Sequence, residues 1–159
     1  MKKLMVILGG GGHTEQMIKL LEQLGSRFEY LYVIPKDDIV SPSKIRIKGK
    51  VYRIKRATYP MGSMFSKIYG SAINFFQSFS LCLRERPYAI LSSGPGTAVF
   101  ISIIGKLLGS KIIFVESWSR VNRPSTSGKI IYKFADLFFV QWENLKKIYP
   151  RSKFAGRLA

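Results

Sequence analysis

Short apolar runs of strand length alternate along the chain with segments of helical periodicity. The strand-length runs are KLMVIL (3–8), EYLYVI (29–34), YAILSS (88–93), KIIFVES (111–117) and LFFVQW (137–142). Helices are predicted at 14–24, 97–108, near 127–135 and near 143–148. Near-continuous apolar strands separated by helices are typical of a parallel sheet covered on both faces. The pattern therefore predicts an α/β, Rossmann-like fold, with one domain spanning 1–159.

Two segments interrupt this alternation. The first, KIRIKGKVYRIKR at 44–56, alternates basic and apolar residues and predicts a strand or hairpin with a positive face; the alternative is a solvated edge kept basic against aggregation. The second, 61–87, has helical periodicity with an apolar arc of roughly 200°, wider than the ~100° stripe of an ordinary surface helix. Basic residues near the ends of such a helix are typical of a lipid interface, and burial against the sheet and a neighbouring subunit is the alternative. The residues expected to associate with a membrane are Phe65, Lys67, Ile68, Tyr69, Phe75, Phe76, Phe79, Arg84 and Arg86.

Charge and composition narrow the classes of partner. The chain has 26 Lys and Arg against 9 Asp and Glu, a formal net charge of +17, which predicts attraction to nucleic acid, a phospholipid surface or a phosphorylated substrate. One alternative function is therefore a basic nucleic-acid-binding α/β domain without enzymatic activity, although RNP, KH and helix-turn-helix signatures are missing.

The single Cys82 and single His13 exclude a disulfide framework and a Cys/His metal cage, and we expect no metal site. The start of the chain lacks the pattern of a secretory signal.

Polar residues follow three of the predicted strands. The carboxyl ends of parallel strands meet at one edge of a sheet, where ligands of open α/β folds bind. The residues expected to contact a substrate there are Gly10, Gly11, Gly12, Thr14, Ser93, Gly94, Gly96, Thr97, Ser117 and Arg120. The glycine loop is neither a dinucleotide fingerprint, because Thr14 stands where the last glycine is needed, nor a P-loop, because no Gly-Lys-Ser/Thr follows. Its bare backbone allows close approach of a phosphate or sugar hydroxyl, or merely close packing of helix and strand.

His13 and Glu116 are the candidate catalytic residues. His13 lies at or just before the start of the helix at 14–24, where the helix dipole should keep the imidazole neutral near pH 7. A neutral histidine can accept a proton as a general base, and a capping or packing role is the alternative. Glu116 ends an apolar strand; it can orient the imidazole, act as a base itself, or pair with Arg120 or Arg123.

Four ordered motifs together resemble the Alg14 family, including its bacterial polysaccharide-biosynthesis members of the PssD/CpsF type. The motifs are LGGGGHTEQM, SSGPGTA, KIIFVESWSRVNRPSTSGK and ADLFFVQWENLKKIYPRSKFAGRL. The resemblance covers nearly the whole chain and is weakest over 36–86. It implies the amino-terminal, acceptor-binding half of a GT-B glycosyltransferase, in lipid-linked oligosaccharide or polysaccharide biosynthesis.

The resemblance also implies the reaction and the partners. A separate Alg13-like subunit would hold most of the UDP-sugar, expected to be UDP-N-acetylglucosamine, and this chain would bind a polyprenyl- or dolichyl-diphosphate-linked sugar acceptor. Transfer would invert the anomeric centre without a bound metal or other cofactor. His13 matches the residue that assists deprotonation of the acceptor, and Glu116 matches the acidic residue of the family's ES motif.

The same resemblance places the protein peripherally on the cytoplasmic face of a membrane. Eukaryotic Alg14 proteins carry an amino-terminal membrane helix, whereas this chain starts directly with its first strand. Membrane contact is therefore expected to rest on the segment 61–87 and on the basic face, with attraction of the chain to an anionic surface and not to nucleic acid.

Overall fold

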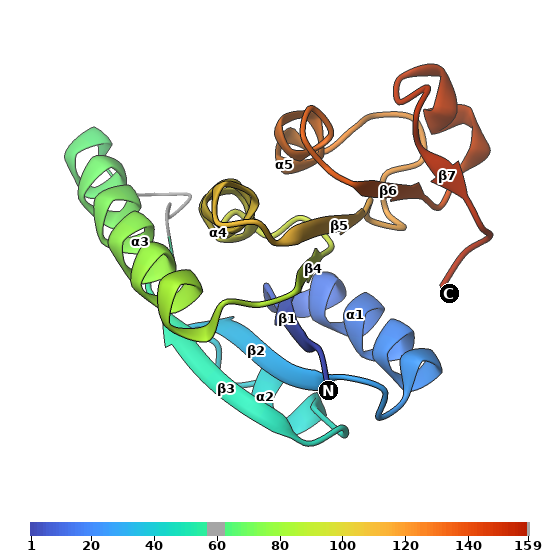
Figure 1. Cartoon of the computed structure of the whole chain (residues 1–159). Coiled ribbons are helices and arrows are strands. Elements are labelled where there is room, and N and C mark those ends of the chain that lie inside the picture. Colours follow the sequence, from blue (N-terminus) through green and yellow to red (C-terminus); the bar gives the residue numbers. More distant parts are fainter. Residues whose placement is uncertain (57–62, 159) are drawn as a thin grey trace.

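A computed structural model, which describes residues 1–56 and 63–158, contains a parallel sheet with the strand order β3-β2-β1-β4-β5-β6-β7 (Figure 1). The strands are β1 (Lys3–Ile7), β2 (Glu29–Pro35), β3 (Gly49–Ile54), β4 (Ala89–Ser92), β5 (Lys111–Val115), β6 (Leu137–Val140) and β7 (Lys153–Phe154). Every neighbouring pair is parallel, and β1 lies between β2 and β4. The chain therefore reverses its direction of winding at β1, the switch point at which ligands of such folds bind. The α/β, Rossmann-like prediction is confirmed.

Each helix predicted from the sequence is present and in the predicted order, but the boundaries differ. They are α1 (Gly11–Leu24), α2 (Ser41–Lys44), α3 (Met64–Glu85), α4 (Ala98–Leu107), α5 (Thr126–Ile131) and the 3-10 helix η1 (Glu143–Lys147). Helix α1 begins at Gly11 and not at 14, so His13 belongs to its first turn. The segment 44–56 forms the single edge strand β3 and no hairpin, and α2 and β7 are short elements that periodicity did not predict.

Helices cover both faces of the sheet, with a hydrophobic core on each. On one face Met5 and Ile7 of β1 pack with buried residues of α3, α4 and α5. On the other face Leu4 and Val6 pack with the buried side of α1. This alternation of neighbouring β1 residues between two cores explains why the strand reads as a continuous apolar run.

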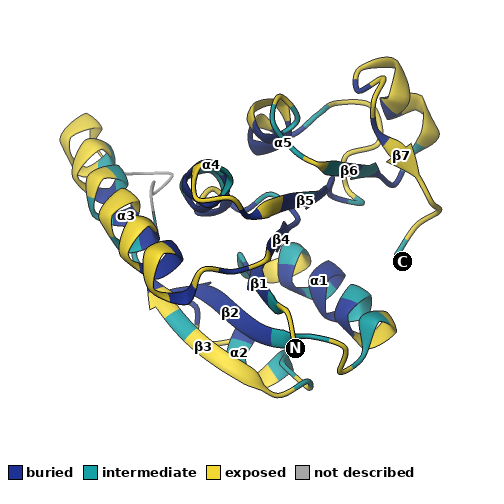
Figure 2. Ribbon diagram, viewed as in Figure 1, coloured by how far each residue is buried: buried dark blue, intermediate teal, exposed yellow. Residues whose placement is uncertain are grey.

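Helix α3 buries its small and polar side and exposes its large apolar side (Figure 2). Its buried residues are Gly70, Asn74, Ser78, Leu81, Cys82 and Glu85. Its exposed large hydrophobic residues are Met64, Phe65, Ile68, Tyr69, Phe75, Phe76, Phe79 and Leu83. Of the residues predicted to associate with a membrane, Lys67 is half-buried and the others are exposed. Most of the wide apolar arc is thus free, and Cys82 is the member of that arc that enters the core.

Polar contacts attach α3 to the edge of the sheet. Asn74 donates to the Lys55 carbonyl at 2.5 Å, just after the carboxyl end of β3. At the other end of α3, Glu85 accepts from the Tyr52 hydroxyl at 2.7 Å and from Lys3, at the start of β1, at 3.1 Å. Residues 64–73 therefore continue past the carboxyl edge of the sheet by about 15 Å, at the rise of an α-helix. Figure 1 shows these first turns standing clear of the other elements.

Among the described residues, none of the helices combines the length and the apolar character needed to cross a bilayer. The two residues at the start of the predicted helical segment, 61 and 62, lie outside the described part of the chain.

Candidate functional site

The loops after β1, β4 and β5 meet at the carboxyl edge of the sheet, as the sequence predicts. Gly9 packs so closely on the Pro95 ring that a Cβ there would overlap it, which brings the first two loops into contact. The carbonyl of Gly94 accepts a hydrogen bond of 2.6 Å from Ser127, at the start of α5. Gly10 has a φ of 79°, which only glycine adopts without strain, and this turn directs the chain from β1 into α1.

His13 lies half-buried in the first turn of α1, against the loop after β4. The Ser93 hydroxyl donates to the His13 carbonyl at 3.2 Å, and its oxygen lies 3.5 Å from His13 Nδ1. Because the Ser93 proton is already donated, that oxygen can only accept, which favours the tautomer with the proton on Nδ1. The lone pair of Nε2 then remains available to a substrate.

Burial lowers the pKa of His13 below its ordinary value of 6.5. A hydrogen bond with the Ser93 backbone and the negative charge of Glu116 raise the pKa, and the positive charge of Arg120 lowers it further. Desolvation is therefore the main reason for a neutral imidazole here, whereas the sequence pointed to the helix dipole. The ring is unprotonated near neutral pH, as a general base requires.

Glu116 is fully buried, and its carboxylate is occupied by the loop that follows it. One oxygen accepts from the Ser117 amide at 3.0 Å, and the other accepts from the Ser125 amide at 3.1 Å and the Tyr149 hydroxyl at 3.3 Å. Within the described residues the carboxylate forms neither a hydrogen bond with His13 nor an ion pair with an arginine. In this geometry Glu116 shapes the loop at 117–125 and acts on His13 through its charge.

Sequence reasoning missed the side chains that join α1 to this loop. Gln16 is fully buried, one helical turn after His13, and its Oε1 accepts from the Trp118 amide at 3.1 Å. From the other side, Gln141 donates to the Glu116 carbonyl at 2.9 Å and Trp142 Nε1 donates to the Trp118 carbonyl at 2.6 Å. A buried polar residue on the apolar side of a predicted helix is the signal that could have identified Gln16.

The remaining predicted substrate contacts divide into exposed and buried positions. Gly11, Gly12, Gly96 and Arg120 are exposed; Gly10 and Gly94 are half-buried; and Thr14, Ser93, Thr97 and Ser117 are buried. Thr14 is buried: its hydroxyl accepts from the Gly10 amide at 3.0 Å and lies 2.7 Å from the Ser41 hydroxyl. Thr14 therefore stabilises the glycine loop, and its contact with a substrate stays a prediction.

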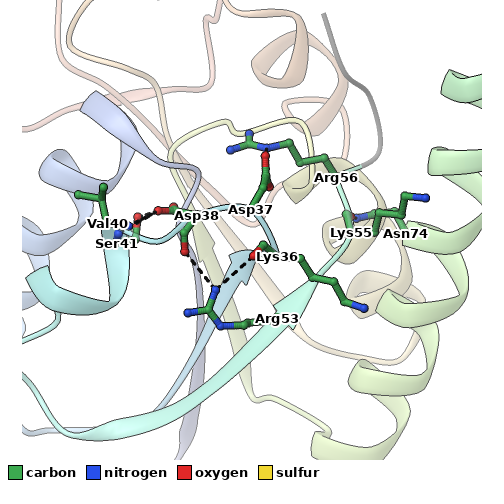
Figure 3. A network of polar contacts seen from close by, with 9 residues as sticks. All are labelled: Lys36, Asp37, Asp38, Val40, Ser41, Arg53, Lys55, Arg56 and Asn74. Atoms are coloured by element: carbon green, nitrogen blue, oxygen red, sulfur yellow. Dashed lines mark hydrogen bonds and ion pairs between the residues drawn. The ribbon is translucent and has the colours of Figure 1, made fainter. Parts of the chain in front are cut away.

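A polar network fixes the segment after β2 beside the glycine loop (Figure 3). Asp38 accepts from the Ser41 amide at 2.9 Å, Arg53 donates to the Asp38 carbonyl at 3.1 Å, and Arg56 Nε donates to Asp37 at 2.7 Å. Asp37, Asp38, Ser41 and Arg56 line a pocket of about 300 Å³ together with residues of the glycine loop. The described residues contain no cluster of three or more His, Cys, Asp or Glu side chains.

The fold and these loops define a Rossmann-like domain with a glycine-rich turn and a neutral histidine at its switch point. The solved structure of Acinetobacter baumannii MurG shares this fold, with a TM-score of 0.75 and 13% identity over 91% of this chain and 43% of MurG. The UDP-N-acetylglucosamine 2-epimerase from Rickettsia bellii is similar in fold, with a TM-score of 0.72 and 15% identity over 99% of this chain and 45% of the epimerase. These likenesses confirm the predicted Rossmann-like fold.

Similarity in sequence is more specific about the family than similarity in fold. Residues 4–158 match the family described as oligosaccharide biosynthesis protein Alg14 like. The UDP-N-acetylglucosamine transferase subunit alg14 of Schizosaccharomyces pombe is 36% identical over 99% of this chain and 84% of its own length. The subunit of the same name from Homo sapiens is 34% identical over 98% of this chain and 82% of its own length. The chain belongs to the Alg14 family, as the motifs predicted.

Proposed function

We propose that this chain is the acceptor-binding subunit of a two-subunit glycosyltransferase that uses UDP-N-acetylglucosamine, and that His13 is its general base. The observation that carries this proposal is the position of the half-buried His13 in the first turn of α1, with Nδ1 3.5 Å from the Ser93 hydroxyl and Nε2 without a hydrogen bond to any described residue. The names of the relatives support the donor and the reaction. They also favour this function over the alternative of a basic nucleic-acid-binding domain.

The chemistry assigned to His13 is a single proton transfer. A hydroxyl of the lipid-linked acceptor attacks the anomeric carbon of the UDP-sugar, and the bond from that carbon to the diphosphate breaks with its electron pair leaving on UDP. His13 Nε2 takes the hydroxyl proton, and the new glycosidic bond has the inverted configuration. A base of this kind contributes about 10²- to 10⁴-fold to the rate. We propose that transfer needs no resident metal or other cofactor.

The proposed partner is an Alg13-like subunit that holds most of the UDP-sugar. This chain matches 43% of the length of MurG, and the proposed partner would supply the part that holds the UDP-sugar. On the α1 side of the sheet, β4, β5 and β6 also line an apolar groove of about 390 Å³, which Leu137 and Phe139 enter half-exposed. An apolar groove of this size on a sheet face favours contact with another protein surface. We assign the partner to this groove.

The proposed acceptor is a polyprenyl- or dolichyl-diphosphate-linked sugar in an anionic membrane, and we place the protein on the cytoplasmic face as a peripheral protein. The exposed apolar side of α3 supports this proposal, because Phe65 is 81% and Phe76 is 69% exposed. The net charge of +17 adds attraction of about 1 kcal/mol for each Lys or Arg close to an anionic surface. The first turns of α3 also extend past the same edge of the sheet as His13.

The test is a transfer assay with vesicles that contain a polyprenyl-diphosphate-linked sugar, UDP-N-acetylglucosamine and an Alg13-like partner. Transfer should require both chains and persist in EDTA. His13→Ala should lower kcat about 10²-fold or more, with the melting temperature and partner binding retained. Because the base works unprotonated and its pKa is lowered, kcat should fall only as pH drops below 6.5, the ordinary pKa of histidine.

Two results would contradict the proposal. Full transfer by this chain alone would remove the need for a partner, and wild-type kcat in His13→Ala would remove His13 from proton transfer. Lys153→Ala, on the exposed strand β7, is the matched control and should behave as wild type.

A further inference from the structure

Trp118 is held by its backbone from two directions. Its amide donates to Gln16 of α1 at 3.1 Å, and its carbonyl accepts from the Trp142 indole at 2.6 Å. These contacts join Trp118 to elements that lie on either side of the loop after β5. The fold therefore holds the backbone at Trp118, whose side chain is half-buried.

The indole N–H of Trp118 faces the first turn of α1. A Cβ built on Gly12 would lie 3.7 Å from Trp118 Nε1, and Gly12 precedes His13 directly. Among the described residues this N–H has no hydrogen-bond partner, whereas the N–H of Trp142 is used within the protein. Indole N–H groups of half-buried tryptophans usually have a partner, so this donor is available to a ligand.

The position of His13 indicates which part of the acceptor lies beside this donor. The base must come within about 3 Å of the acceptor hydroxyl, so the part of the acceptor beside His13 is the sugar ring that carries that hydroxyl. Trp118 Nε1 lies close to Gly12, the residue before His13, and the Lys19 ammonium lies over the Trp118 ring, 5.4 Å from its centroid. The Ser117 and Ser119 hydroxyls lie 3.0 Å apart in the same loop.

We infer that Trp118 binds the sugar of the lipid-linked acceptor, with its indole N–H donating a hydrogen bond to an oxygen of that sugar. The inference rests on the proposed function, since the acceptor defines which sugar lies beside His13. It assigns a specificity-determining contact to a residue outside the predicted site. It also gives Gly12 a role, because any side chain there would lie against the indole N–H.

Two variants test the contact from its two sides. Trp118→Phe keeps an aromatic ring and removes the N–H. Gly12→Ala keeps the helix, because Gly12 has no positive φ, and places a methyl group in ordinary contact with the indole. Each variant should raise the acceptor KM about 5- to 30-fold, while the KM for UDP-N-acetylglucosamine and the pH dependence of kcat stay unchanged. The double variant should be no worse than the more damaged single variant.

A binding measurement separates this inference from the proposed function. The dissociation constant of a short-chain N-acetylglucosaminyl-diphosphoryl-prenol is measured on the chain alone, with the sugar-free prenyl diphosphate as the comparison. Trp118→Phe should weaken only the sugar-bearing ligand. Equal weakening of both ligands, or unchanged affinity and KM in both variants at wild-type melting temperatures, would overturn the inference. Loss of transfer in the wild-type pair, with this binding difference intact, would overturn the proposed function and leave the sugar contact standing.

Discussion

Glu116 is a carboxylate that organises a site from inside the protein. It lies at the carboxyl end of β5, yet both of its oxygens are occupied by the amides of Ser117 and Ser125 and by Tyr149. The negative charge raises the pKa of the Tyr149 hydroxyl, which burial also raises and to a greater degree. The neutral hydroxyl therefore remains a donor to Glu116 over the whole working range of pH.

Glu116→Gln should reduce stability more than it reduces the chemical step. The amide group would turn N–H donors toward backbone donors, and loss of a buried, charge-assisted acceptor costs about 2 kcal/mol. For a chain of this size that corresponds to a fall of roughly 4–8 °C in melting temperature. Glu143→Gln, at an exposed glutamate in η1, is the control and should not change it. An unchanged melting temperature with a large loss of kcat would instead identify Glu116 as a base.

The sequence predicts which residues reach the site but not how they are partnered there. His13, Ser93 and Glu116 could be placed together because parallel strands end at one edge. The burial of Thr14 and the hydrogen bond from the Trp118 amide to Gln16 depend on contacts between distant segments, which no local sequence pattern predicts. The start of α1 was misplaced because glycine normally disfavours a helix, whereas here the Thr14 hydroxyl stabilises the turn at Gly10.

At the scale of the element, α3 shows that hydrophobic periodicity alone does not determine which side of a helix packs on the sheet. Its length and helical character follow from the sequence, but its wide apolar arc does not say which side faces the sheet. The structure buries Gly70, Asn74 and Ser78, whose small size allows close approach to β3 and α4, and Asn74 satisfies the Lys55 carbonyl beside the sheet edge. The orientation of the helix therefore combines hydrogen bonding at the sheet edge with packing of Leu81 and Cys82 in the core.

Polar replacements on the exposed side of α3 should weaken membrane binding without weakening the fold. Phe65→Ser combined with Ile68→Ser removes two side chains that are 81% and 63% exposed. Partial insertion of each such side chain contributes about 1 kcal/mol to the free energy of membrane binding. The affinity for vesicles with anionic lipid should therefore fall at least 10-fold in a sedimentation assay. Leu107→Ser, at a position 81% exposed at the end of α4, is the matched control. Equal losses in both variants would contradict a specific role for α3.

At the scale of the molecule, the two faces of the sheet are unequally covered. Helices α3, α4 and α5 follow one another across one face, whereas α1 covers the strands at the centre of the other (Figure 1). Strands β4–β6 line an apolar groove on the α1 side. The residues of the closing segment 155–158 form one wall of that groove. Burial alternates along β6: Leu137 and Phe139 are half-buried in this groove, whereas Phe138 and Val140 are buried.

A polar side chain in this groove should impair assembly with the partner. Phe139 is half-buried on the groove side of β6. Phe139→Ser should therefore destabilise the complex with the partner more than it destabilises the isolated chain. We expect the dissociation constant for the partner to rise about 10-fold or more, from the apolar area lost, and transfer to recover at high partner concentration. Leu107→Ser again serves as the control. Wild-type affinity in Phe139→Ser would place the partner elsewhere.

The projection of α3 past the carboxyl edge of the sheet affects how a lipid-linked substrate would reach His13. With the first turns of α3 in the bilayer, the cleft would face the headgroup region, and the acceptor would arrive by lateral diffusion without leaving the membrane. The effective concentration of acceptor is then its mole fraction in the bilayer. Diluting it with inert lipid at constant bulk concentration would slow transfer, a surface-dilution behaviour set by the geometry of one helix.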